Sequence, residues 1–219
     1  MNEELTEELT EELTERLTEE ISYEISILID SGFYNPNEIL EIIEEQFIDE
    51  KVSLDEIEDI ISYKYDEKIA RENKWMKPTD FDKLKECFNQ LNKNNIITVH
   101  NAGYTIGEGV QDSFEVFHHL KTKDIVPEGF CFYHFQDIER AIESELLNIA
   151  FGDFENSEKK TLEIGKKIAD VLKNNGFSVN WNEDINTRLE INPFKWEKLF
   201  DNEEYEIEGA FNSFLDNNK

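Results

Sequence analysis

The sequence predicts an α+β protein with α/β-like alternation, in which an N-terminal helical region precedes a mixed sheet of about five strands with helices. Three observations predict this fold. The 219 residues are 38% hydrophobic, which suffices for a folded core. Apolar residues follow a helical period up to about residue 74, and short apolar runs alternate with helical patterns after it. We therefore divide the chain into an acidic helical region (1–74), an α/β domain (75–200) and a C-terminal tail (201–219).

The N-terminal region begins with a Glu-Leu-Thr-Glu repeat over residues 1–20, in which an apolar residue recurs at every fourth position. On a helix this spacing drifts by about 40° per step, and glutamates four residues apart repel each other. We therefore expect the repeat to fray and a firm helix to run from near Ile21 to Gly32, a natural C-cap. Two more helices are expected, with start signals at Asn35-Pro36 and at the capping box of Ser53 and Glu56.

The second region reads as alternating strands and helices. Its first helix is capped by Thr79 or Asp80. The expected strands lie at 96–100, 129–135, 146–152, 177–181 and 187–191, and the expected helices between them at about 109–121, 136–145 and 158–175. The last two strands are separated by five residues, which predicts a β-hairpin.

Acidic side chains dominate the chain, which has a net charge of −29. Residues 1–74 hold 24 acidic and 6 basic side chains, a net charge of −18. The remainder holds 27 acidic and 16 basic side chains, a net charge of −11. Such a field repels a phosphate backbone and attracts a basic protein, so we expect a basic protein partner and no nucleic acid. Solubility alone is the alternative reason for the charge.

The remaining composition indicates a cytoplasmic protein. No apolar run approaches the roughly 20 residues of a membrane span, and the acidic start lacks the features of a secretory signal. Cys87 and Cys131 lie in apolar patterns, outside any CxxC pair, and are expected to be buried thiols. We predict no cofactor and no metal, while the oligomeric state is not predicted.

Catalytic candidates follow two predicted strands. His100 ends the strand at 96–100, and His134 and Asp137 follow the next strand. If these strands are parallel, both histidines lie at the carboxyl edge of the sheet, where ligands bind in open sheets. Two histidines with a carboxylate suit a divalent metal, or a histidine base oriented by Asp137. The alternative is that each histidine caps a strand end by hydrogen bonding to backbone or to an aspartate.

The loop after His100 contains the ligand-binding candidates. Its backbone N–H groups would face an anion in front of the next helix, which carries Asp112. Asn and Gly tolerate left-handed backbone, so the alternative is a tight strand-to-helix turn. The ligand-binding candidates are Asn101, Gly103, Tyr104, Thr105 and Asp112.

Several stretches together resemble an uncharacterised bacterial domain-of-unknown-function family (6891). The resemblance covers roughly residues 72–200, with a helical lead-in from about 21, and leaves the repeat at 1–20 outside. It implies a bacterial, cytosolic protein and brings no activity. The stretches that carry it are His100-Asn101-Ala102-Gly103-Tyr104-Thr105, Tyr133-His134-Phe135-Gln136-Asp137, Ile149-Ala150-Phe151-Gly152, Val179-Asn180-Trp181 and Arg188-Leu189-Glu190-Ile191.

Three hypotheses for function follow. The first is a protein-binding module, immunity-like or inhibitor-like, whose acidic helices neutralise a basic partner. The second is an enzyme or a small-ligand or metal-binding protein that uses His100, His134 and Asp137. The third gives these histidines a purely structural role and places the function on another surface. The charge asymmetry, and the lack of a familiar catalytic motif, favour the first.

Overall fold

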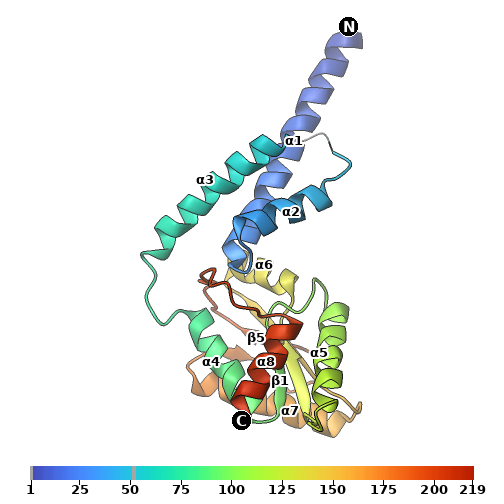
Figure 1. Ribbon diagram of the computed structural model, residues 1–219, viewed down its shortest axis with the longest axis vertical. Coiled ribbons are helices and arrows are strands. Elements are labelled where there is room, and N and C mark those ends of the chain that lie inside the picture. Colours follow the sequence, from blue (N-terminus) through green and yellow to red (C-terminus); the bar gives the residue numbers. More distant parts are fainter. Residues whose placement is uncertain (1, 51–52) are drawn as a thin grey trace. The chain divides into compact units, whose positions relative to one another are not determined.

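The computed structural model describes residues 2–50 and 53–219. The chain forms two compact units. Unit 1 comprises Met1–Trp75 with Leu199–Asn202, and unit 2 comprises Met76–Lys198 with Glu203–Lys219. Helices and a mixed sheet of five strands confirm the predicted α+β class (Figure 1).

Unit 1 contains three helices, α1 (Asn2–Ser31), α2 (Pro36–Gln46) and α3 (Leu54–Glu72). They pack through isoleucines at helical spacing, namely Ile21, Ile25, Ile39, Ile43, Ile57 and Ile61. Asn35 caps α2 as predicted, because its Oδ1 accepts the N–H groups of Asn37 and Glu38. Ser53 occupies the N-cap of α3, but its side chain makes no capping hydrogen bond, so the capping box predicted there is wrong.

The repeat lies within α1, which continues to Asn2 where the sequence predicts fraying. Glu and Leu are strong helix formers, and α1 contains neither Gly nor Pro to interrupt it. The helix ends where predicted, at Gly32, whose φ of 73° is a left-handed conformation that suits glycine.

The sheet of unit 2 has the strand order β1-β2-β3-β5-β4. β1 and β2 are parallel, and every other neighbouring pair is antiparallel, including the predicted β4–β5 hairpin. The strands are β1 (Ile96–Val99), β2 (Gly129–Phe132), β3 (Leu147–Asp153), β4 (Val179–Asn180) and β5 (Leu189–Ile191).

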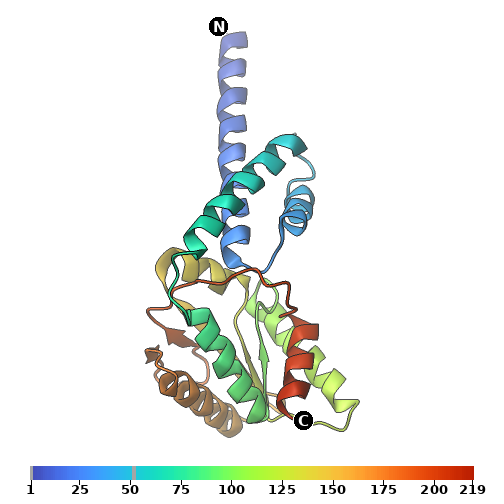
Figure 2. The same cartoon turned by 60° about the vertical axis from the view of Figure 1, so that its left-hand side comes forward.

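Five helices surround this sheet (Figure 2). α5 and α8 pack against β1 and each other, α4 packs against β1 and α7, and α7 packs against β3. Gly129 and Gly165 lie where β2, β3 and α7 approach closely. The helices are α4 (Asp80–Lys93), α5 (Ile106–Lys121), α6 (Phe135–Ser144), α7 (Glu158–Asn174) and α8 (Ile207–Asn217).

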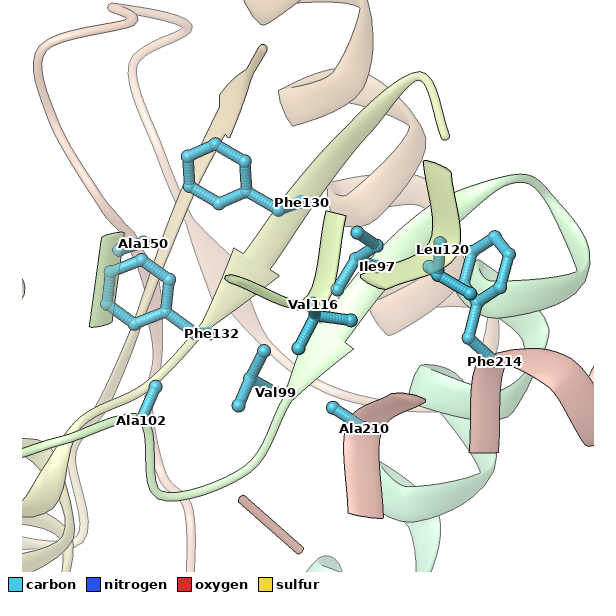
Figure 3. Packing of buried hydrophobic residues seen from close by; sticks show 10 residues of the cluster. All are labelled: Ile97, Val99, Ala102, Val116, Leu120, Phe130, Phe132, Ala150, Ala210 and Phe214. Atoms are coloured by element: carbon cyan, nitrogen blue, oxygen red, sulfur yellow. The ribbon is translucent and has the colours of Figure 1, made fainter. Parts of the chain in front are cut away.

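The segment 201–219 is not merely a tail, because its helix α8 completes a hydrophobic core. Ala210 and Phe214 are buried with residues of β1, β2 and α5 (Figure 3). The apolar spacing in the sequence indicates this helix, because one helical face contains Ile207, Ala210, Phe211, Phe214 and Leu215.

Two glycines of α5 provide a matched test of this packing. A Cβ at Gly109 would overlap the ring of Phe132, whereas a Cβ at Gly107 meets only Thr105 Oγ1 at 3.8 Å. We expect Gly109→Ala to lower the free energy of unfolding by about 1–3 kcal/mol through overpacking. Gly107→Ala is expected to raise it by up to about 1 kcal/mol through helix propensity. Denaturant unfolding measures both, and equal effects would contradict the close α5–β2 contact.

Candidate functional site

The two predicted catalytic histidines follow neighbouring parallel strands, as expected. Val99 pairs with Phe132, so the next pair in register is His100 with Tyr133, and His134 comes one residue later. Both histidines lie beyond the last paired residues of these strands, so the register alone does not fix where their side chains point. Within the described residues no hydrogen bond or ring contact joins His100 to His134, and their joint action stays a prediction.

His100 is buried within an aromatic cluster. Its ring contacts Phe81, Phe88, Tyr133 and Tyr205, with ring centroids 4.4–5.6 Å away. Its Nδ1 lies 2.8 Å from the Tyr133 hydroxyl. Burial lowers the pKa of His100 well below its usual value, and two nearby lysine ammonium groups act in the same direction. The residue is thus a neutral core histidine that braces the end of β1.

The loop after His100 is a tight turn that leads directly into α5. Asn101 and Gly103 have φ values of 51° and 61°, as predicted for a turn. α5 begins at Ile106 rather than near Gly109, with Thr105 as its N-cap. The Thr-x-x-Glu spacing of Thr105 and Glu108 is the sequence pattern of a capping box, and it indicates this start.

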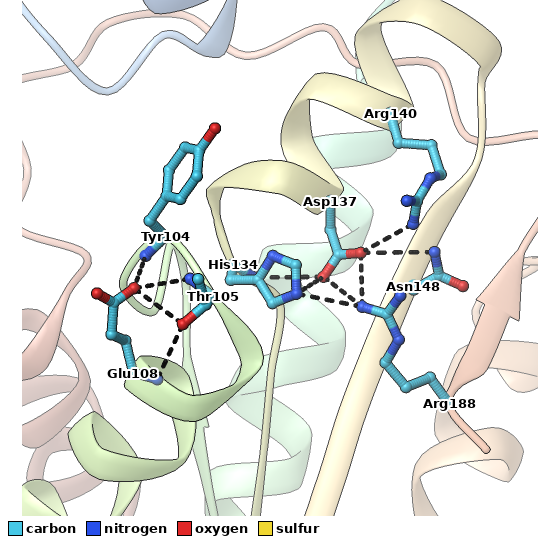
Figure 4. Close-up of polar contacts among 8 residues, drawn as sticks. All are labelled: Tyr104, Thr105, Glu108, His134, Asp137, Arg140, Asn148 and Arg188. Carbon is cyan, nitrogen blue, oxygen red and sulfur yellow. Dashed lines mark hydrogen bonds and ion pairs between the residues drawn. The ribbon is translucent and has the colours of Figure 1, made fainter.

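The carboxylate of Glu108 fills the anion cradle predicted in this loop (Figure 4). Its Oε2 accepts the backbone N–H groups of Tyr104 and Thr105, each at 2.8 Å, and the Thr105 hydroxyl at 3.1 Å. These hydrogen bonds, chiefly those from the backbone of Thr105 and Tyr104, lower the pKa of Glu108. The predicted anion site in front of α5 is therefore occupied by a side chain of the same helix.

The other loop candidates serve the fold as well. Asn101 is buried, and its Nδ2 donates to Glu206 Oε1 at 3.1 Å. Tyr104 is 51% exposed and stacks on Phe135. Asp112 lies half-buried on α5, and burial raises its pKa, as do two nearby glutamates. Within the described residues, no hydrogen bond joins Asp112 to either histidine or to Asp137.

His134 and Asp137 do come together, at the start of α6. His134 Nε2 lies 3.2 Å from Asp137 Oδ2, and the His134 backbone N–H donates to the same oxygen. The Asp137 carboxylate has no exposed surface. His134 is the N-cap of α6, the backbone N–H of Asp137 donates to the His134 carbonyl at 2.9 Å, and His134 Nδ1 is buried with no hydrogen-bond partner among the described residues. This arrangement fits the strand-end alternative, in which histidine and aspartate brace the turn.

Three further donors converge on Asp137, and none was a sequence candidate (Figure 4). Arg188 Nη1 donates to both carboxylate oxygens, at 2.7 and 2.9 Å. Arg140 Nη1 lies 3.5 Å from Oδ1, and Asn148 Nδ2 donates to Oδ1 at 3.4 Å. Arg140 follows Asp137 by three residues on a predicted helix, a spacing that signals contact. Arg188 and Asn148 are distant in sequence and carry no such signal.

Protonation of His134 is disfavoured in this cluster. Burial lowers the pKa of His134, and the charge of Asp137 opposes that shift while Arg188 and Arg140 add to it. His134 Nε2 lies 3.3 Å from Arg188 Nη1 as well as 3.2 Å from Asp137 Oδ2, so whether it donates or accepts depends on the tautomer of the ring. The cluster therefore holds one negative charge and two positive charges.

A different candidate surface lies on α2, α3 and their connection in unit 1. We call it the acidic surface, and define it by the exposed carboxylates Glu41, Glu44, Glu45, Asp49, Glu50, Asp55, Glu56, Glu58 and Asp59. Two large apolar side chains are exposed among them, Ile48 at 78% and Leu54 at 50%. Among the residues described, none forms an ion pair with these carboxylates, whereas Arg71 pairs with Asp30 and Lys68 with Glu72.

Residues 2–50 and 53–219 carry neither a metal-binding group nor a helix that could span a membrane. No group of three or more histidine, cysteine, aspartate or glutamate side chains is placed there to hold a metal ion. None of the helices in these ranges combines the length and the apolar character that crossing a bilayer requires.

The fold and its carboxyl-edge cluster define an α+β protein with a mixed sheet and a helical N-terminal unit. A family model described as "Domain of unknown function (DUF6891)" matches residues 14–200, so the chain belongs to this family. The family match confirms the resemblance found in the sequence, but it begins at residue 14 and so includes the end of the repeat. No curated protein and no solved structure matches the chain.

The buried, neutral histidines predict a pH dependence of stability. The pKa of His100 lies well below 6.5 in the folded state, so below pH 6.5 the unfolded chain binds more protons than the folded chain. We expect the free energy of unfolding to fall between pH 7 and 5.5, with a slope of up to about 1.4 kcal/mol per pH unit from His100. His100→Phe should flatten this slope while lowering stability at pH 7, and an unchanged slope would contradict a neutral His100.

Asp137 and Arg140 form a matched pair for the cluster itself. Asp137→Ala would leave Arg188 without its buried counterion, and we expect it to cost about 3–5 kcal/mol of unfolding free energy. Arg140→Ala removes a side chain that is 45% exposed, so it should cost less than about 1 kcal/mol. Chemical denaturation measures both, and a cost below about 1 kcal/mol for Asp137→Ala would show that the cluster does not hold the fold.

Proposed function

We propose that this protein is a protein-binding module, of the immunity or inhibitor kind, that binds a basic protein through its acidic surface. One observation carries the proposal: the carboxylates of the acidic surface are exposed, lack ion-pair partners among the described residues, and are close in sequence to the exposed Ile48 and Leu54. Apolar contacts within a ring of complementary charge are the usual composition of a protein interface.

Charge and apolar exposure together favour a partner over simple solubility. Carboxylates alone keep a protein soluble, but solubility does not call for isoleucine and leucine side chains in water. A basic partner would gain from steering by residues 1–74, with a net charge of −18, and would cover these apolar side chains on contact. The same field disfavours nucleic acid as the partner.

We further infer a bacterial cytosolic setting, supported by the family resemblance and by two buried free thiols, Cys87 and Cys131. An enzyme built on His100, His134 and Asp137 has less support, because no contact among the described residues joins His100 to His134 and the Asp137 carboxylate is buried under its own donors.

A matched pair of multiple variants tests the proposal. The first replaces Ile48 with Ser and converts Glu44, Glu45, Asp55 and Glu58 to their amides. The control replaces Val126, 62% exposed, with Ser and converts Glu115, Glu158, Asp170 and Glu208 to amides, so both lose the same charge. The immobilised full chain captures basic proteins from a bacterial lysate, and each captured protein is purified and titrated calorimetrically against the three chains.

We expect one basic protein whose affinity falls at least about tenfold with the first variant, stays within about twofold with the control, and weakens as salt increases. Equal affinity for both variants, an affinity insensitive to salt, or capture of no basic protein would each overturn the proposal.

A further inference from the structure

We propose that Arg140 and Arg188 form a binding site for an oxyanion group, phosphate or carboxylate, of a small ligand at the edge of the sheet in unit 2. This inference is independent of the proposed function, because it concerns the cluster around Asp137 and not the acidic surface. It rests on three observations: the charge of the cluster, the exposure of the two guanidinium groups, and the way in which they are held.

The charge of the cluster is the first observation. One buried carboxylate needs one counterion, and Arg188 supplies it through two short hydrogen bonds. Arg140 approaches the same carboxylate at 3.5 Å and adds a second positive charge. Asp137, Arg140 and Arg188 together carry an excess of one positive charge, in a chain whose net charge is −29. The carboxylate of Glu108 lies near enough to His134 to interact with it, and its Oε2 accepts the backbone N–H groups at the start of α5.

The exposure of the guanidinium groups is the second observation. Their inner nitrogens face Asp137, which is fully buried (Figure 4). The Arg188 side chain is nevertheless 26% exposed, and the Arg140 side chain 45% exposed. A guanidinium carries five N–H donors, and the hydrogen bonds to Asp137 use only part of them. Donors therefore remain at the outer edges for an acceptor that comes from solvent.

The way in which the side chains are held is the third observation. Arg188 Nη1 contacts both oxygens of Asp137 and the Nε2 of His134, which restrains the side chain, so less side-chain entropy would be lost on binding a ligand. The planar fork matches the oxygens of a phosphate or carboxylate, which gives charge-assisted hydrogen bonds. The site also lies beside the carboxyl ends of β1 and β2, where open sheets bind ligands.

The test uses the full chain labelled with ¹⁵N and two probes, inorganic phosphate and acetate. Arginine Nε–H signals are followed by NMR while sodium chloride is exchanged for probe at constant ionic strength. Arg140→Gln removes one charge, and Arg188→Lys keeps the charge but removes the fork. The control is Arg71→Gln in unit 1, an arginine that is 55% exposed and pairs with Asp30 at 2.5 Å.

We expect saturable shifts of the Arg140 and Arg188 signals, with a Kd of about 1–10 mM for at least one probe. Arg140→Gln and Arg188→Lys should each weaken binding at least about tenfold, while Arg71→Gln leaves it unchanged. Comparison of the two probes assigns the ligand group as phosphate or carboxylate. The proposal would be overturned if the arginine shifts fail to saturate by 50 mM with both probes, or if binding survives in Arg140→Gln. Thermal unfolding confirms that each variant is folded.

Discussion

The buried carboxylate of Asp137 is the constraint on which the edge of the sheet in unit 2 depends. It joins the start of α6, which follows β2, to Asn148 on β3 and to Arg188 just before β5. The parallel and antiparallel parts of the sheet are thus tied together at one charged group. Because an ionised carboxylate out of water costs several kcal/mol unless it is paired, the position of each donor is fixed by electrostatics as well as by packing.

The exposed carboxylates of unit 1 differ from the carboxylates of Asp137 and Glu108 in unit 2, because they have fewer hydrogen-bond donors around them. In unit 2, Asp137 and Glu108 are each surrounded by donors from nearby residues. In unit 1, the buried ammonium of Lys68 bonds to the Ile29 carbonyl at 2.6 Å and lies near Glu72, while the carboxylates of the acidic surface remain in water. Burial lowers the pKa of Lys68 to about 8. The carboxylates of the acidic surface therefore have no ion-pair partner among the described residues, whereas the carboxylate of Asp137 is paired with Arg188.

Short sequence motifs predicted several of the helix ends and turns of this fold. The features that the sequence did not predict depend on contacts between residues far apart in the chain. The caps at Asn35 and Thr79, the turn at Asn101 and the stop at Gly32 each depend on a few adjacent residues. The pairing of Asp137 with Arg188 spans 51 residues, and it depends on the order of the strands in the sheet. His100 contacts the Tyr133 hydroxyl and His134 contacts Asp137, and strand ends alone do not predict these different partners. The apolar spacing of α8 indicates a helix, but its place in the core depends on contacts with β1 and α5.

The first turns of α5 and α6 are already occupied by carboxylates, which explains why an anionic ligand at this edge would bind to arginine side chains and not to backbone N–H groups. The first turns of α5 and α6 offer backbone N–H groups, the usual anion site of an open sheet. Glu108 takes those before α5, and Asp137 takes the N–H of His134 before α6. An incoming anion would therefore meet carboxylates at both helix starts, and it would be repelled. The outer faces of Arg140 and Arg188 are the part of this cluster where positive charge reaches solvent. Their distance in sequence from the predicted loop shows that the chemistry of the edge is set by tertiary contacts rather than by the loop motif.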